Sequence, residues 1–270
     1  MIIQRYLWTD REGFCLLKLR VLGCSGGVGL GLRTTSLLVN DSVLIDAGSG
    51  VGDLTLDEMS GIKHLFITHS HLDHINFLPL LLDSMFESLI DPIQVHAQPV
   101  TIRAIQDHIF NWTIWPDFTK LPTAENSVIQ FVEMLPNDKV DIDGHSYEMI
   151  EVSHIVPAVG YRVGYEGKSF AFSGDTSSND SFWNNLNAHP DLDMLIVETA
   201  FPEALYDLAL KARHYTPSLL VEDLKKLRHK PDIYLTHLKP GAENQIINEV
   251  KAADPSLSLK ILQSGSIFEL

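Results

Sequence analysis

The stretch of this chain best suited to chemistry is a cluster of metal-binding side chains that follows a short apolar run at 64–67. Four potential metal ligands occupy six consecutive positions: His69, His71, Asp73 and His74. Imidazoles this close together lose hydration and repel one another when protonated, so a purely packing role is disfavoured. The apolar run predicts a buried strand. We expect the first two histidines in the turn after it and the Asp-His pair at the start of a helix over 73–85.

This spacing fits a hydrolytic centre with two metal ions about 3.5 to 4 Å apart. Further ligand types follow later apolar segments, at His154, Asp175 and His237. Any one of them alone would be read as an ordinary loop residue, but together they indicate one site at one edge of a sheet. Each ion would receive three residues of its own and one shared carboxylate: His69, His71 and His154 for one ion, Asp73, His74 and His237 for the other, and Asp175 for both.

The ligand set suits two divalent ions. Zinc binds imidazole and carboxylate, and manganese or iron can occupy the same ligands. Coordination lowers the pKa of water to about 7, which supplies a nucleophile at neutral pH. The leaving alkoxide still needs a proton. His214 precedes a helix start, and Glu198 at a strand end could hold it as a carboxylate–imidazole pair that acts as general acid. The alternative is that His214 is a surface loop residue. Asp73 is also a catalytic candidate.

Three other features have two interpretations each. The glycine-rich loop 23–31 either permits a tight turn or lines a substrate pocket. Asp46 either orients a ligand histidine or caps a turn. The segment 110–118 carries four aromatic residues without helical or strand periodicity. It is either a packed hydrophobic cluster or a lid over a pocket.

Short apolar segments alternate with amphipathic ones along the whole chain. The predicted strands are 16–22, 35–39, 42–46, 64–67, 92–96, 128–134, 146–152, 168–172, 193–197 and 232–235. The predicted helices are 73–85, 99–110, one that starts at Pro217, and 243–253. This order predicts an α/β fold in which two sheets pack face to face with helices outside. With no linker or repeat, we expect one domain over 1–270.

Composition limits the partners. The chain of 270 residues is 45% hydrophobic and has a net charge of −15, which argues against a long nucleic acid because such binding relies on many Lys and Arg contacts. No apolar run approaches the ~20 residues of a membrane span. Cys15 and Cys24 are too few for a disulfide framework. We therefore expect reduced thiols, a cytoplasmic protein and no membrane partner.

The arrangement His-x-His-x-Asp-His at 69–74 resembles the metallo-β-lactamase superfamily. Further segments resemble, in order, the class II 3′,5′-cyclic-nucleotide phosphodiesterases: 110–118, 153–154, 173–176, 197–202 and 214–217. Two positions differ from that family's pattern. Phe77 stands where a small residue is usual, and Arg213 stands where the family has glycine.

This resemblance implies a four-layer αββα sandwich and a dimetal centre on the residues assigned above. It also implies hydrolysis of cyclic AMP or cyclic GMP to the 5′-monophosphate, with Glu198 and His214 assisting. We expect the base to stack on aromatics of 110–118. A tRNA 3′-processing nuclease is the enzyme alternative, although the basic arm expected of it is missing from 75–150. A non-catalytic metal-binding scaffold is the other alternative. A homodimer is an expectation that no residue pattern specifies.

Overall fold

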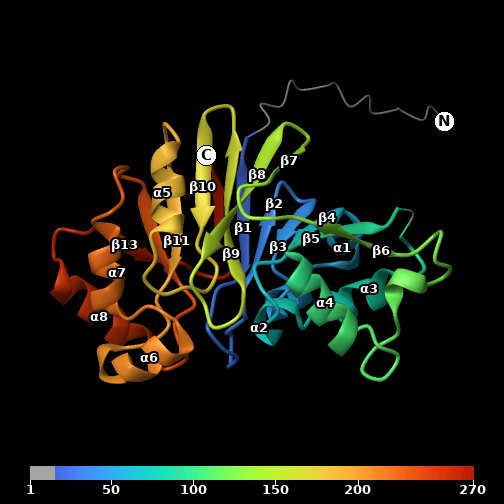
Figure 1. Ribbon diagram of the computed structural model, residues 1–270, viewed down its shortest axis with the longest axis horizontal. Coiled ribbons are helices and arrows are strands. Elements are labelled where there is room, and N and C mark those ends of the chain that lie inside the picture. Colours follow the sequence, from blue (N-terminus) through green and yellow to red (C-terminus); the bar gives the residue numbers. More distant parts are fainter. Residues whose placement is uncertain (1–15, 90) are drawn as a thin grey trace, which may run out of the picture.

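The computed structural model describes residues 16–89 and 91–270. The part of the chain it describes forms two seven-stranded sheets that pack face to face, with helices on their outer faces (Figure 1). The expected αββα sandwich is therefore confirmed. The prediction for Cys15 lies outside the described residues. No helix in the described ranges is long and apolar enough to cross a membrane.

The first sheet contains, in spatial order, β14 (Ile267–Glu269), β1 (Lys18–Gly23), β2 (Ser36–Val39), β3 (Val43–Ile45), β4 (His64–Phe66), β5 (Ile93–Ala97) and β6 (Ile129–Glu133). The second contains β13 (Leu259–Ile261), β12 (Asp232–Thr236), β11 (Met194–Glu198), β10 (Lys168–Phe172), β9 (Ala158–Tyr165), β8 (His145–Val152) and β7 (Lys139–Ile142). Strands β3 to β6 are parallel, as are β10 to β13. Parallel strands bring their carboxyl ends to one edge, which is where the candidate ligands follow them.

Helices cover both outer faces. The first half of the chain supplies α1 (Leu56–Ser60), α2 (Leu72–Ile75), α3 (Leu78–Met85) and α4 (Pro99–His108), and the second half supplies α5 (Ser181–Ala188), α6 (Tyr206–Ala212), α7 (Pro217–Leu224) and α8 (Glu243–Ala253). Three apolar clusters hold the layers together. One lies between the sheets and includes Phe66, Tyr161 and Ile196. The others lie under the helices of each half.

The continuous helix expected over 73–85 is wrong. The chain forms α2 and α3 with a break at Asn76 and Phe77. The backbone N–H of Phe77 donates to the carbonyl oxygen of Ala47 at 2.9 Å, and Pro79 lies in the first turn of α3, where its missing N–H costs nothing. The break ties the ligand-bearing helix α2 to the loop after β3.

Several elements had no clear sequence signal. Strand β9 pairs with both β8 and β10, yet its sequence is interrupted by Gly160 and Gly164. A Cβ at Gly160 would lie 2.6 Å from the carbonyl oxygen of Phe172, so the close packing of the strand requires glycine there. Strands β7, β13 and β14 are short and partly exposed, and α1, α5 and α6 are also short.

Candidate metal centre

The candidate ligands lie where strands end at one edge of the sandwich. His69 and His71 occupy the loop after β4, and Asp73 and His74 occupy α2. The remaining three follow strands of the second sheet: His154 after β8, Asp175 after β10 and His237 after β12. The structure thus gathers residues from four separate segments of the chain, as the sequence predicts.

The ligand atoms form two groups that share one carboxylate. The first group is His69, His71, His154 and Asp175, and the second is Asp73, His74, His237 and Asp175. Within each group the ligand atoms lie within 4.8 Å of one another. This division is the one expected for two ions with a bridging aspartate.

Buried atoms without hydrogen-bond partners provide a test of whether a metal fits. Among the described residues, Nε2 of His69, Nε2 of His74 and Oδ1 of Asp175 are buried and have none. Oδ2 of Asp175 lies 3.6 Å from Nε2 of His69 and 3.4 Å from Nε2 of His74. Ligands at about 2.0 to 2.1 Å from a common zinc ion have separations of this order. Divalent ions would satisfy these atoms, so the residues fit a metal.

Neighbouring groups fix which ring nitrogen faces the centre. Nδ1 of His74 donates to Oδ2 of Asp46 at 2.7 Å. The hydroxyl of Thr68 donates its single proton to the same carboxylate at 2.8 Å, so it accepts from Nδ1 of His69 at 3.0 Å. Both rings therefore direct Nε2 toward the candidate ions, the nitrogen that a neutral ring would offer as a ligand. Asp46 thus contacts a candidate ligand histidine, as the orienting interpretation expects.

Arg213 performs the same role for His154. Its carbonyl oxygen accepts from Nδ1 of His154 at 3.0 Å, and its guanidinium donates to the carbonyl oxygen of His154 at 3.0 Å. Arg213 has a φ of 53°, a left-handed conformation that favours glycine. Arginine thus adopts a strained conformation at a position where the class II phosphodiesterases have glycine. Its guanidinium adds a second contact to the loop that carries His154.

Electrostatics favour neutral ligand rings at most positions. Burial lowers the pKa of His69 well below its usual range, that of His154 to about 4 and that of His237 to about 3. Burial also opposes protonation of His74, but Asp175 and Asp46 outweigh it and raise the pKa of that ring. A divalent cation would neutralise the negative charge that Asp175 and Asp46 place around His74.

Glu198 and His214 form a buried pair beside the ligands. Nδ1 of His214 lies 2.7 Å from Oε1 of Glu198, and the His214 ring contacts that of His154 with centroids 4.8 Å apart. Glu198 also accepts from the backbone N–H of Thr176 and of Ala200. Burial opposes protonation of His214, but Glu198 raises the pKa of the ring. His214 is 7% exposed, which is against the surface-loop interpretation.

The glycine-rich loop 23–31 begins against the centre. A Cβ on Gly26 would lie 2.3 Å from the carbonyl oxygen of His237, so glycine is required for this close approach. The far end of the loop is open to solvent, with Val28 70% exposed and Leu30 fully exposed. Glycine therefore permits the tight turn against His237, and the pocket-lining interpretation stays a prediction.

The aromatic segment 110–118 contains both buried and exposed aromatic side chains. Phe110 and Phe118 are buried in the apolar core under α3 and α4, so neither can stack on a substrate. Trp112 is 59% exposed, and the backbone N–H of Trp112 donates to the carbonyl oxygen of Trp115 at 3.0 Å in a tight loop. The stacking prediction is wrong for the two phenylalanines and stays a prediction for the two tryptophans.

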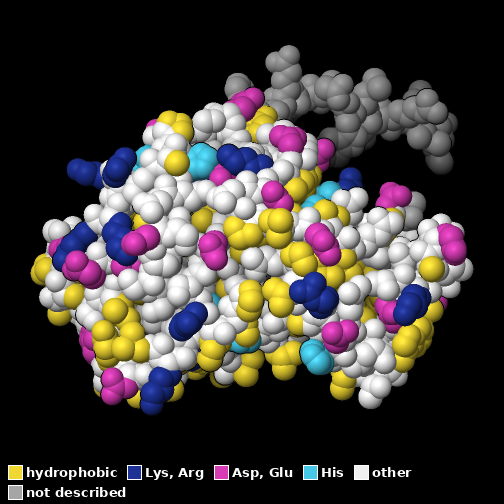
Figure 2. All heavy atoms as spheres, in the orientation of Figure 1, with side chains coloured by type: hydrophobic (Ala, Val, Ile, Leu, Met, Phe, Trp, Pro, Cys, Tyr) yellow, Lys and Arg dark blue, Asp and Glu magenta, His cyan; other side chains and the backbone are white. Residues whose placement is uncertain are grey.

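Hydrophobic side chains gather along the lower edge of the molecule, with histidines among them (Figure 2); α2 and α6 lie at this edge in Figure 1. Leu72 and Ile155, each adjacent in sequence to a candidate ligand, are 63% and 58% exposed. The rim of the metal centre is thus partly apolar.

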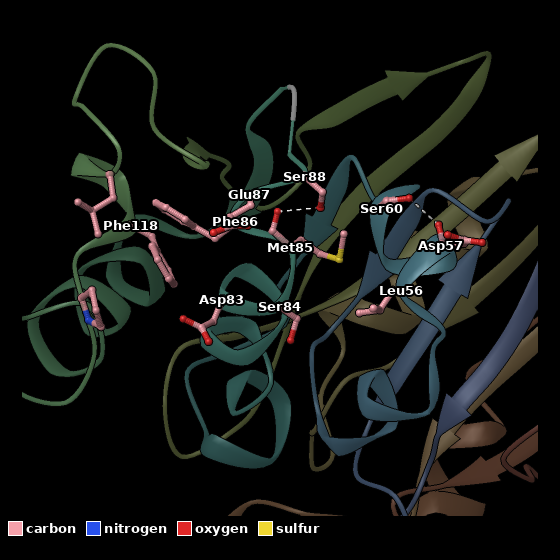
Figure 3. A pocket seen from close by; sticks show the side chains of 12 residues that line it. Leu56, Asp57, Ser60, Asp83, Ser84, Met85, Phe86, Glu87, Ser88 and Phe118 are labelled. Atoms are coloured by element: carbon pink, nitrogen blue, oxygen red, sulfur yellow. Dashed lines mark hydrogen bonds between the residues drawn. The ribbon is translucent and has the colours of Figure 1, made fainter.

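A separate hollow of about 790 Å³ lies between α1, the end of α3 and the segment 116–121 (Figure 3). Asp57, Asp83 and Glu87 line it together with Met85 and several serines. It contains none of the candidate ligands, and its acidic lining does not suit an anionic substrate.

Two supporting residues had no role in the sequence interpretation. Thr68 directly precedes the first ligand histidine, and its position in the motif is a signal that could have identified it. Asp223 in α7 has no comparable signal in the sequence. Its buried carboxylate accepts from Tyr215 Oη at 2.7 Å, Ser178 Oγ at 2.7 Å and Trp183 Nε1 at 3.0 Å. It therefore connects the segment after Asp175 to the segment that carries His214.

Comparisons with known proteins agree with this geometry. A family model described as "Beta-lactamase superfamily domain" matches residues 41–238. A probable 3′,5′-cyclic-nucleotide phosphodiesterase of Yersinia pestis is 27% identical, over 82% of this chain and 77% of that protein. The structure of unliganded yeast PDE1 has a TM-score of 0.79 at 18% identity and covers 94% of this chain and 99% of that one. Human tRNase Z, short form, has a TM-score of 0.68 at 19% identity, covering 93% and 98%. These two structures share the fold, and the family match shows that the chain belongs to the beta-lactamase superfamily of metallohydrolases.

Proposed function

We propose that this protein is a dinuclear-metal phosphodiesterase that hydrolyses 3′,5′-cyclic nucleotides, cyclic AMP or cyclic GMP, to 5′-monophosphates. The observation that carries the proposal is the buried Glu198–His214 pair beside two ligand groups that share Asp175. A protein that only stored or carried metal would not need an acid–base pair there. Relatives named cyclic-nucleotide phosphodiesterases over most of the chain support the substrate class.

The metal-holding residues are those of the two groups described above, with zinc the metal that best matches the imidazole and carboxylate donors. When bound, two such ions supply Lewis acidity and an activated water. Asp46, Thr68 and the carbonyl of Arg213 keep ligand histidines in the tautomer that presents Nε2. Asp73, at 31% side-chain exposure, is the most accessible carboxylate of the second group and borders the space for substrate.

His214 would provide the proton for the departing 3′-oxygen. Its Nδ1 is occupied by Glu198, so Nε2 is the atom available to the substrate. The carboxylate of Glu198 favours the protonated ring, which is the state that a general acid needs before the bond breaks. The apolar rim with Leu72 and Ile155, and the exposed Trp112, suit a substrate with a flat base attached to a charged phosphate.

The proposal is tested with cyclic AMP, cyclic GMP, a linear diester and a lactone, with identification of each product. We expect 5′-monophosphates from the cyclic nucleotides. Turnover of linear diesters or lactones alone would leave only the metallohydrolase assignment. Ribonuclease Z of Haloarcula marismortui matches 88% of this chain at 24% identity, so tRNA belongs in the same assay. Salt-sensitive binding of tRNA with cleavage at the acceptor end would favour that alternative.

A further inference from the structure

Lys239 is fixed in the wall of the metal centre, two residues after the ligand His237. Its backbone N–H donates to the carbonyl oxygen of Ala200 at 3.1 Å. Its ammonium group donates to the carbonyl oxygen of Gly26 at 2.8 Å. Gly26 itself packs directly on the backbone of His237. The positive charge of Lys239 is therefore held close to one candidate ligand by two loops that meet there.

An aromatic ring connects the same lysine to the acid–base pair. Nζ of Lys239 lies 5.6 Å from the centroid of the Phe201 ring. The Phe201 ring in turn meets the ring of His214 edge-on, with centroids 5.5 Å apart. Lys239, Phe201 and His214 thus form one continuous wall beside the second ligand group.

The charge of Lys239 is not neutralised by the protein. Its polar contact is with a carbonyl oxygen, and it forms no salt bridge with a carboxylate in the described ranges 16–89 and 91–270. An ammonium group has three donors, and Gly26 uses one of them. In a chain with a net charge of −15, Lys239 lies without a carboxylate partner at the edge that also holds Asp73, Asp175 and Glu198. It is placed to meet an anion.

We propose that Lys239 is a specificity-determining residue whose ammonium group binds the anionic part of the substrate. It would select phosphodiester anions, and their phosphate monoester products, over neutral molecules of the same shape. The inference rests on the proposed phosphodiesterase function for the identity of the anion. The competing interpretation is structural: Lys239 would only join the loop at Gly26 to the loop after β12.

The test compares Lys239→Met, which keeps the length of the side chain and removes the charge, with Lys239→Arg, which keeps the charge. Lys251→Met is the matched control, because Lys251 is an exposed lysine of α8 whose loss changes the net charge equally. Calorimetry on metal-loaded protein measures binding of adenosine 5′-monophosphate and of neutral adenosine. We expect Lys239→Met to bind the monophosphate about tenfold more weakly, the usual effect of one charge-assisted hydrogen bond, with adenosine unchanged. Lys239→Arg and Lys251→Met should retain the affinity.

Several outcomes would overturn the inference. They are unchanged affinity of Lys239→Met for the monophosphate, an equal loss for adenosine, loss of bound metal, or no binding of the monophosphate by the wild type. Hydrolysis assays separate this inference from the proposed function. Lys239-dependent binding without turnover of cyclic nucleotides would refute the function alone. Turnover of cyclic AMP by Lys239→Met with an unchanged KM would refute this inference alone.

Discussion

Two groups of histidines lie beside β4 and differ in what surrounds them. Beyond the carboxyl end, His69 and His74 bond through Nδ1 to Thr68 and Asp46, and their Nε2 atoms converge on Asp175. Within the sheet, Nδ1 of His64 in β4 lies 3.1 Å from Nε2 of His96 in β5. In the centre, Nε2 of His154 lies 3.2 Å from Nδ1 of His71, so the distances between ring nitrogens are similar. Proximity of imidazoles therefore does not distinguish a metal centre.

The surroundings of the rings do distinguish it. His96 stacks on Phe66 with centroids 4.4 Å apart, and no carboxylate bonds to either ring of the His64–His96 pair in the described residues. Burial lowers the pKa of both rings, that of His96 to about 4. The pair is a neutral hydrogen-bonded contact, whereas the centre combines oriented rings with buried carboxylates. A metal site needs the groups that orient its ligands as well as the ligands.

The change that should separate the two regions most is Asp175→Asn, because Asp175 belongs to both ligand groups. We expect loss of bound metal and a fall in kcat/KM of more than about 10⁴-fold, beyond the 10² to 10⁴ of general acid–base catalysis alone. Metal analysis and hydrolysis of bis-p-nitrophenyl phosphate measure both effects. Retention of metal and activity would mean that Asp175 is not a shared ligand.

The next largest effect should come from Glu198→Gln, which removes the charge that supports protonation of His214. We expect kcat on cyclic nucleotides to fall by about 10² to 10⁴-fold. The loss should be smaller on p-nitrophenyl esters, whose leaving group needs no proton. Glu148→Gln is a matched control, since Glu148 is also buried and lies 2.8 Å from His189, away from the centre. Equal losses on both substrates would assign Glu198 a purely structural role.

A smaller effect is expected of Asp46→Asn. Asp46 has a φ of 59°, which asparagine tolerates, so the backbone should remain in place. The neutral amide is a weaker partner for Nδ1 of His74, and metal affinity should fall by about 10 to 100-fold. Competition with a chelator measures it. An unchanged affinity would show that Asp46 does not orient His74 as a ligand.

The smallest effect on activity is expected of His96→Phe, which should change stability and not catalysis. The pKa of His96 is about 4 in the folded protein and 6.5 ordinarily. Between these pH values the unfolded chain binds a proton that the folded chain does not, so stability falls as the pH drops from about 6.5 to about 4. Over this pH range the free energy of unfolding of the wild type should fall by up to about 3 kcal/mol because of His96, and the variant should lack this fall. Denaturant unfolding at several pH values tests it, and reduced activity at neutral pH would contradict the comparison.

Much of the fold follows from local patterns. The short buried strands β4, β10 and β12 are apolar runs followed by candidate ligands, β11 ends at Glu198, and α8 has the bounds that its apolar face predicts. The two-sheet layering follows from their alternation. Strand β9 could not be predicted, because glycines that its packing requires interrupt the apolar pattern. The break between α2 and α3 depends on a hydrogen bond from Phe77 to Ala47, a contact that spacing in the sequence does not reveal.

The candidate metal ligands are easier to predict from the sequence than the groups that orient them. Ligand types at strand ends identify the seven metal-binding candidates, because few other roles require them there. The orienting groups are ordinary residues or backbone atoms. The carbonyl of Arg213, which bonds to His154, has no sequence signature, and neither does Asp223 beneath the ligand loops. Which aromatics of 110–118 are accessible also depends on packing, which buries Phe110 and exposes Trp112.

The central claim, a dinuclear centre at this edge, is tested most directly by counting metal ions in the purified protein after reloading with zinc. Elemental analysis should give about two ions per chain. Hydrolysis of bis-p-nitrophenyl phosphate should disappear on chelation and return on reloading. Full activity after chelation and dialysis, or protein that binds no metal with its histidines intact, would contradict the account.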